Sequence, residues 1–338
     1  MVSTRRTARN NSFERKINDD QWSSSRVRKP LPDPPSVLHV MTLVVLHVCK
    51  KIVFFSIHVR ILAYLTLLFA LSSIADVLPM PKMPFNSANS FLNTYFVKLG
   101  WFWTLFLSVP FVFMTSYTYC CGKKEQIMKH LARLLIATVF WYAWVNLFVY
   151  IEGLYGQCER RELKSKSVCL KTASKWIGFD LSGHTFILIY SNLVLIEEVR
   201  PIQGWEGIAD LIRDESHSRD HGIVNYGPLR GLSSPDFDKT KTQYKRFLPW
   251  VRLNFVLVTF ISIMWDHMLI STIVYFHSMP EKLISGIIAI GTWFITYRLC
   301  YGRQKLLPGD GSFRYFSNEE DTKPIYKQPS RRNSLNAN

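Results

Sequence analysis

Six long apolar segments are the feature that most constrains how this chain folds. They are residues 53–77, 97–118, 132–151, 184–199, 252–277 and 283–301. Crossing about 30 Å of hydrocarbon takes about 20 predominantly apolar residues in a helix, and backbone polar groups in lipid must be satisfied within the segment. The pattern predicts an all-α membrane protein with six transmembrane helices, of which the fourth has the shortest purely apolar part.

The lysines and arginines are distributed unevenly between the segments that flank these helices. Most of them lie in residues 1–51, 119–131, 200–252 and the stretch from Arg298 onward, although the 152–182 loop also contains several. Positively charged residues favour the cytosolic side of a membrane. An even number of spans places both ends on one side, so we predict that both termini are cytosolic.

The remaining sequence is arranged around a six-span membrane domain, 52–303. Residues 1–36 and 304–338 are polar and predict disordered cytosolic tails, the first of them basic. Residues 37–51 are apolar but too short to span, and predict a segment at the membrane interface. Residues 200–251 show little apolar periodicity and predict a mostly irregular cytosolic loop. The formal net charge of +16 favours anionic lipids over nucleic acid, because no folded basic surface accompanies it.

The cysteines fall at two informative places. Cys158 and Cys169 lie in the luminal 152–182 loop, where an oxidising compartment favours a disulfide. The Cys120-Cys121 pair precedes two lysines at a cytosolic helix end, a setting that suits S-palmitoylation and equally suits ordinary interfacial cysteines. The sequence contains no CxxC or Cys/His spacing typical of zinc, and it predicts no metal site and no cofactor.

Two histidines lie at the ends of neighbouring predicted spans. His184 begins the fourth span and His277 ends the fifth. These spans run antiparallel and are joined by the cytosolic loop, so both histidines are expected on the luminal face. Each histidine alone is typical of a helix start or an interface anchor. Their convergence on one face is not required by packing, and it indicates a functional site.

The first turn of the fourth span contains Asp180, Ser182, Gly183 and His184. Ser182 is predicted to cap the helix, and the exposed amides after it favour phosphate through the positive end of the helix dipole. His184 is then placed to give a proton to a phosphate leaving group. Asp180 is placed to orient an imidazole.

His277 is the second predicted reactive group, because a neutral imidazole can attack phosphorus and form a phosphohistidine that water hydrolyses. Glu281, four residues further on, would hold its ring in one tautomer. Asp266 and His267 lie near the bilayer midplane, where an ionisable group is either functional or part of a helix–helix contact. Asn146 is a candidate partner for that contact.

Five short motifs follow one another in the membrane domain, at residues 93–104, 140–142, 178–186, 274–283 and 292–298. Together they resemble the fat storage-inducing transmembrane (FIT) family, and the resemblance extends from residue 50 to residue 303. That family is similar to the lipid phosphate phosphatases, which are six-span enzymes with a Ser-Gly-His acid and a second, nucleophilic histidine.

The resemblance implies a lipid phosphate phosphatase-like bundle in the endoplasmic reticulum membrane, with a luminal active site. It implies cleavage of the diphosphate of fatty acyl-coenzyme A to acyl 4′-phosphopantetheine and adenosine 3′,5′-bisphosphate, in support of lipid-droplet formation. His184 matches the acid and His277 the nucleophile. The implied partners are the acyl-coenzyme A substrate and membrane lipids, including triacylglycerol and diacylglycerol. Which proteins it binds is left open.

Two basic motifs of the phosphatases are missing from this chain. Their Lys followed by Arg-Pro is absent, since Arg200-Pro201 is cytosolic and has no Lys upstream, and Ser271 stands where an Arg precedes the nucleophile. The phosphate charge would then be met by the helix amides, by a luminal Lys or Arg such as Lys175, or by a metal.

A non-catalytic scaffold that binds triacylglycerol or diacylglycerol is the alternative function. The aromatic clusters at 101–103 and 141–144 suit lipid binding, but aromatic residues are also normal at membrane interfaces. A transporter is disfavoured, because neither paired broken helices nor repeat symmetry is evident.

Overall fold

The computed structural model describes residues 36–78, 91, 93–159, 166–172, 176–178, 180–222 and 227–301. The tails predicted at 1–36 and 304–338 lie outside this range, apart from Ser36. The chain forms two compact units. Residues 206–237 are the described part of one, and the other described residues form the second unit, called the bundle below.

The bundle is made of helices, as the sequence predicts. Its helices are α2 (Val37–Val53), α3 (Ile57–Thr66), η1 (Leu67–Leu71), α4 (Ser72–Val77), η3 (Asn93–Val97), α5 (Gly100–Tyr119), α6 (Lys124–Tyr155), α7 (Lys166–Lys171), α8 (Gly183–Glu198), α9 (Ile202–Trp205), α11 (Ser234–Tyr275), α12 (Met279–Trp293) and η4 (Phe294–Tyr301). The η elements are π-helical turns, and the first residues of α11 belong to the other unit. A π-helical segment links α3 to α4, and another extends α12.

Four described helical segments are long and apolar enough to cross a membrane. They are Ile57–Val77, Lys124–Tyr155, Ser234–Tyr275 and Met279–Tyr301. The other two predicted spans correspond to α5 and α8, which are helical but are not among these four. α5 contains several buried serines and threonines, and α8 has only 16 residues. The protein is therefore an all-α membrane protein.

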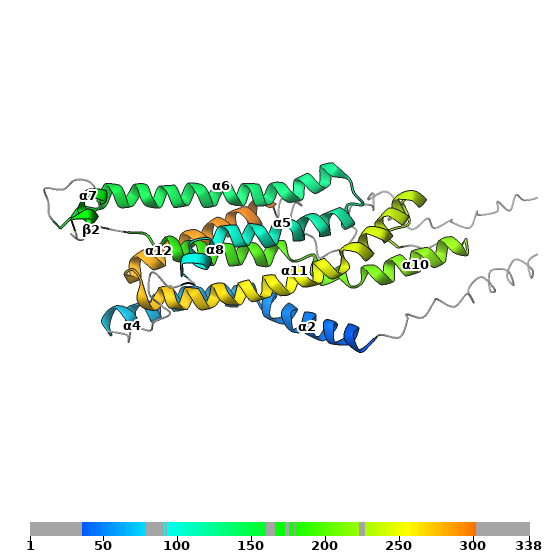
Figure 1. Cartoon of the computed structure of the whole chain (residues 1–338), viewed down its shortest axis with the longest axis horizontal. Helices are drawn as coiled ribbons and strands as arrows, with labels where there is room; N and C mark the ends of the chain where they lie inside the picture. The colour runs from blue at the N-terminus through cyan, green and yellow to red at the C-terminus, as the bar shows by residue number, and fades with distance from the viewer. Residues whose placement is uncertain are drawn as a thin grey trace, which may run out of the picture. The chain divides into compact units, whose positions relative to one another are not determined.

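α8 is the most deeply buried helix of the bundle. Its residues from Thr185 to Glu198 are all buried, and it packs against α5, α6 and α12, which lie beside it in Figure 1. A helix that contacts protein on every side needs no apolar surface for lipid. This explains why its apolar sequence is short and why it accommodates Ser191 and Asn192.

One end of the bundle holds both histidines, and we call it the histidine end (His184 and His277). Here Glu281 of α12 accepts a hydrogen bond from the backbone nitrogen of Asp180 at 2.9 Å. Asp76, near the end of α4, accepts one from the first backbone nitrogen of α12 at 2.8 Å. α4 thus ends, and α8 and α12 begin, at the same end of the bundle.

The opposite end of α8 is the glutamate end, defined by Glu197 and Glu198, whose side chains are fully buried. Arg133 of α6 binds Glu198 through Nε and Nη2 at 3.0 and 2.8 Å. Arg298 of η4 donates to Glu197 at 2.7 Å, and Tyr119, the last residue of α5, donates to a backbone carbonyl just beyond α8 at 2.9 Å. The four segments long and apolar enough to cross a membrane, taken together with α5 and α8, therefore alternate in direction along the chain.

A polar cluster joins three helices, α3, α8 and α11. Asp266 of α11 accepts hydrogen bonds from Arg60 Nη1 at 2.9 Å, Tyr64 Oη at 2.6 Å and Asn192 Nδ2 at 2.8 Å. Of the two roles considered for Asp266 from the sequence, the structure shows the helix–helix contact. The partner considered from the sequence is wrong, because Asn146 turns back along α6 and donates to a carbonyl of its own helix at 2.7 Å.

The prediction of a mostly irregular loop at 200–251 is wrong. This stretch contains α9, α10 (Ile208–Asp220) and the first part of α11. Within α10, Arg213 pairs with Asp210 and Arg219 with Glu215, each at 2.8 Å. Charge pairs three and four residues apart stabilise a helix without apolar periodicity, and apolar periodicity alone therefore misses it.

The interfacial segment predicted at 37–51 is a helix, α2, that extends to Val53. In the 152–182 loop the predicted disulfide between Cys158 and Cys169 is confirmed. The described part of this loop also contains a short antiparallel pair, β1 (Gln157–Cys158) with β2 (Trp176–Ile177). These links bring the chain back to the start of α8.

Candidate active site

Both predicted histidines line one cavity of about 350 Å³ at the histidine end. His184 is the second residue of α8, and His277 lies in the turn between α11 and α12. Lys98, Glu152 and Asp180 complete the charged part of the lining. The size is within the range of small-molecule sites. The structure thus brings together the pair of imidazoles that the sequence predicts to converge.

The start of α8 is fixed by Ser182, which is the helix N-cap as predicted. Its Oγ accepts a hydrogen bond from the backbone nitrogen of Thr185 at 3.3 Å. Gly183 lines the cavity, and apart from its own helix backbone and chain neighbours, no heavy atom of the described residues lies within 4 Å of the place where a Cβ would stand. The first turn of α8 is therefore open to a ligand, and the positive end of the helix dipole favours an anion there.

His277 is held in an unusual backbone conformation, with φ of +57°. Such a conformation is costly for a residue with a side chain and is often found at functional sites. The Nδ1 atom of His277 lies 3.8 Å from Asp180 Oδ2 and 3.9 Å from Glu281 Oε2. Two carboxylates on this side of the ring favour a proton on Nδ1 and leave the lone pair on Nε2.

Glu281 also has a structural task that fixes its position. Its Oε1 accepts a hydrogen bond from the backbone nitrogen of Asp180 at 2.9 Å, and its Oε2 accepts one from that of Ser278 at 2.8 Å. Ser278 and Glu281 form the capping box of α12. Glu281 thus joins the approach to α8 to the start of α12, and the Ser-x-x-Glu spacing is the sequence signal for this role.

Lys98 and Glu152 are the charged lining residues that the sequence reasoning missed. Lys98 lies between η3 and α5 with an exposed side chain, and Glu152 lies in the last turn of α6. Lys175, the cation named from the sequence, lies outside the described residues. The signal for Lys98 was its place at the start of the predicted span 97–118, within the motif at 93–104.

An apolar wall forms the rest of the cavity lining. Trp141, Val145, Phe148 and Val149 of α6 and Ile187 of α8 contribute to it. Val149 is 65% exposed, which places this wall beside the surface that faces lipid. The cavity therefore combines ionisable groups at one end with a surface suited to hydrocarbon.

A family model described as Fat storage-inducing transmembrane protein matches residues 82–156 and 155–297 of the chain. This chain belongs to the FIT family. Several curated relatives have the printed name Acyl-coenzyme A diphosphatase FITM2. The Drosophila melanogaster protein is 44% identical, with 91% of this chain and 74% of the relative covered. The Xenopus laevis protein is 30% identical over 76% of this chain and 86% of its own length.

The Homo sapiens protein of the same name is 28% identical over 68% of this FIT chain and 78% of its own length. No solved structure matches the chain. Among the described residues, no group of three or more His, Cys, Asp or Glu side chains is placed to hold a metal ion.

Proposed function

We propose that this FIT protein hydrolyses the diphosphate of fatty acyl-coenzyme A in the endoplasmic reticulum membrane and thereby supports lipid-droplet formation. The products are acyl 4′-phosphopantetheine and adenosine 3′,5′-bisphosphate. The observation that carries the proposal is that His184 and His277 line one cavity, with carboxylates facing Nδ1 of the second. The diphosphatase name of the relatives agrees with this chemistry.

The proposed topology has six membrane crossings. The four segments that meet the length and hydropathy requirements are completed by α5 and α8, which alternate with them in direction. The tails at 1–36 and 304–338 and the 200–251 segment are cytosolic, because they hold most of the lysines and arginines. The histidine end of the 52–303 domain then faces the lumen, and the 37–51 segment lies at the cytosolic interface.

In the first step, Nε2 of His277 attacks one phosphorus of the diphosphate. A nitrogen–phosphorus bond forms as the bond from that phosphorus to the bridging oxygen breaks. The protonated imidazole of His184 gives its proton to the departing oxygen. The leaving fragment is thus released as a phosphate ester, and its sister fragment remains attached to His277.

In the second step, water attacks the phosphorus of the phosphohistidine. His184, now neutral, takes a proton from this water, and the nitrogen–phosphorus bond breaks to regenerate His277. Asp180 and Glu281 stabilise the positive charge that the phosphorylated imidazole carries. Ser182 and Gly183 shape the helix start that receives phosphate oxygens, and Lys98 supplies the cation that the missing basic motifs would otherwise provide.

The acyl chain of the substrate lies along the apolar wall of α6, next to the lipid-facing Val149. Membrane lipids, including triacylglycerol and diacylglycerol, are the other partners that we propose. No cofactor or metal takes part in the proposed steps.

The test is acyl-coenzyme A cleavage by purified protein in lipid nanodiscs, with products identified by mass. His184→Ala and His277→Ala should each lose more than about a hundredfold in kcat. The matched control is His221→Ala, which removes an exposed histidine directly after α10 and should keep full activity. Trapping of a phosphorylated His277 in the His184→Ala protein would support the covalent step.

Wild-type hydrolysis by the His184→Ala/His277→Ala double variant would refute the proposal. Restoration of droplets in cells by that variant, without product formation, would instead favour the lipid-binding scaffold.

A further inference from the structure

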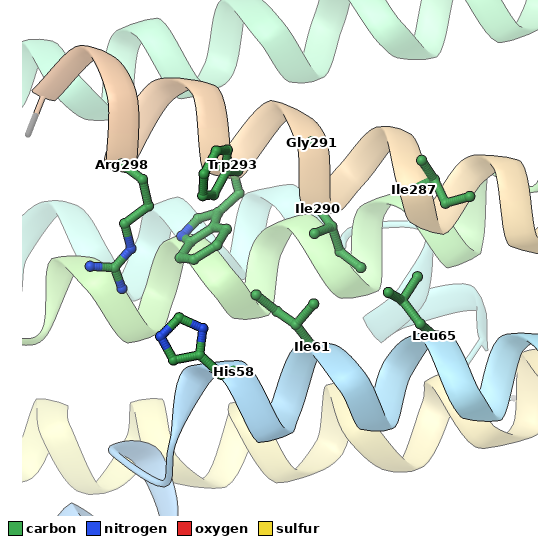
Figure 2. Close-up of a pocket in the computed structure, with 9 residues that line it drawn as sticks. His58, Ile61, Leu65, Ile287, Ile290, Gly291, Trp293 and Arg298 are labelled. Atoms are coloured by element: carbon green, nitrogen blue, oxygen red, sulfur yellow. The ribbon is translucent and has the colours of Figure 1, made fainter.

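A second cavity, of about 520 Å³, lies between α3 and the α12–η4 segment. Figure 2 shows His58, Ile61 and Leu65 on one helix facing Ile287, Ile290 and residues further along the other. It shares no lining residue with the candidate active site. Because His184 and Glu197 are 13 residues apart on α8, the two ends of the bundle are separated by about 20 Å.

The walls of this cavity suit a hydrocarbon chain. Five of its nine lining residues are Ile, Leu or Phe. From Ile287 to Arg298 the lining covers about 16 Å of helix, close to the thickness of one leaflet's hydrocarbon, about 15 Å. The neighbouring Phe294 and Ile295 are 48% and 53% exposed, as expected of side chains that face lipid. An acyl chain can therefore enter from the bilayer.

One end of the cavity carries positive charge. Arg298 lines it and donates to Glu197 at 2.7 Å. Arg200 pairs with the other oxygen of the same carboxylate, also at 2.7 Å. Two guanidinium groups thus share one carboxylate, because the neighbouring Glu198 is bound by Arg133. These three arginines and two glutamates together carry one net positive charge. The His58 imidazole lies on the facing helix at this end of the cavity (Figure 2).

Trp293 provides an unused hydrogen-bond donor at the same place. Its side chain is 1% exposed and lines the cavity, and the guanidinium of Arg298 lies 5.2 Å from its ring. Its Nε1 has no hydrogen-bond partner among the described residues. A buried indole nitrogen normally has a partner, so this donor points to a polar ligand atom.

We propose that this cavity binds an anionic glycerophospholipid, with one acyl chain between α3 and α12 and the phosphate at Arg298. The phosphate accepts hydrogen bonds from the guanidinium of Arg298 and from Trp293 Nε1. A neutral glyceride has no negative charge to pair with the arginine. With the topology proposed above, the lipid comes from the cytosolic leaflet. The site is separate from hydrolysis and does not depend on it.

Gly291 offers a way to close this cavity without disturbing the helix. It lines the cavity, and within 4 Å of where its Cβ would stand the described residues place no heavy atom beyond Gly291, its two neighbours and its own helix backbone. Gly291→Leu therefore places a side chain in the space proposed for the acyl chain. Gly153 in α6 has equally open surroundings and does not line the cavity, so Gly153→Leu is the matched control.

The experiment uses full-length protein in nanodiscs that contain one of two photoreactive probes. One is phosphatidic acid with a diazirine on an acyl chain, and the other is diacylglycerol with the same chains. After irradiation, cross-links on residues 57–66 and 287–301 are quantified by mass spectrometry. The phosphatidic acid probe should label these residues about tenfold more than the diacylglycerol probe.

Gly291→Leu should reduce phosphatidic acid labelling about tenfold, because it fills the acyl space, whereas Gly153→Leu should leave it unchanged. Arg298→Gln should bring the two probes to equal labelling. If that variant does not fold, Gly291→Leu still carries the test. Equal labelling of the wild type by both probes would overturn the proposal, as would undiminished labelling of Gly291→Leu.

Discussion

Asp180 is predicted to accelerate phosphoryl transfer through its charge alone. Its Oδ2 lies 3.8 Å from Nδ1 of His277, and its side chain is 50% exposed. At this exposure a water-like dielectric applies, and the attraction between a carboxylate and an imidazolium at that distance is about 1 kcal/mol. Asp180→Asn keeps the size of the side chain and removes this attraction. Because the imidazole becomes positive as it is phosphorylated, kcat should fall about fivefold.

The assay is acyl-coenzyme A hydrolysis at a series of salt concentrations. Salt screens an exposed charge pair, so wild-type kcat should fall towards that of Asp180→Asn as salt rises, whereas kcat of the variant should change little. Glu125→Gln, which removes a carboxylate that is 81% exposed and paired with Lys129, is the control and should match wild type. A loss above about a hundredfold would refute this reasoning, since charge at this exposure cannot supply it.

Three further predictions follow from the same structure. Lys98→Met should raise KM for acyl-coenzyme A about fivefold, because one phosphate contact by an exposed cation is worth about 1 kcal/mol. Lys98→Arg should keep a KM near that of the wild type. Steady-state kinetics measure both values. Asp266→Asn should destabilise the bundle by about 2 kcal/mol, because the side chain of Arg60, which is 9% exposed, loses its carboxylate partner. The thermal midpoint of unfolding in detergent should therefore fall. An unchanged midpoint would contradict the prediction. Burial raises the pKa of the Cys120 thiol to about 12. Because only the thiolate reacts, alkylation of Cys120 at pH 8 should be more than about tenfold slower than that of the exposed Cys300, and its rate should still rise with pH up to 10. Equal rates for the two cysteines would contradict the burial of Cys120.

The membrane helices were predictable because hydropathy records what faces lipid. Hydropathy indicated α8 only weakly, because that helix contacts protein on every side and does not need an apolar surface for lipid. The pairing of His184 with His277 was predictable from the alternation of helix direction, which needs no knowledge of packing. The helix over Ile208–Asp220 was missed, because its local stabilisation comes from charge pairs that an apolar pattern does not report.

The polar contacts within the bundle could not be read from the sequence. Asp266 meets Arg60 and Asn192, which are 206 and 74 residues away along the chain, and the choice among polar partners depends on how the helices rotate about their axes. The same holds for Lys98, whose place in the cavity depends on the turn before α5. The positive φ of His277 is likewise set by the turn that joins α11 to α12.

The charges of the cavity also bear on which phosphate it accepts. Its described lining includes two carboxylates, from Glu152 and Asp180, against one lysine, Lys98, and two histidines. A phosphomonoester carries close to two negative charges on one phosphorus at neutral pH, and such a group would meet these carboxylates with little compensation. Each phosphorus of an internal diphosphate carries only one. The absence of the phosphatases' two basic motifs therefore agrees with the proposed diphosphate substrate, in which each phosphorus carries less charge.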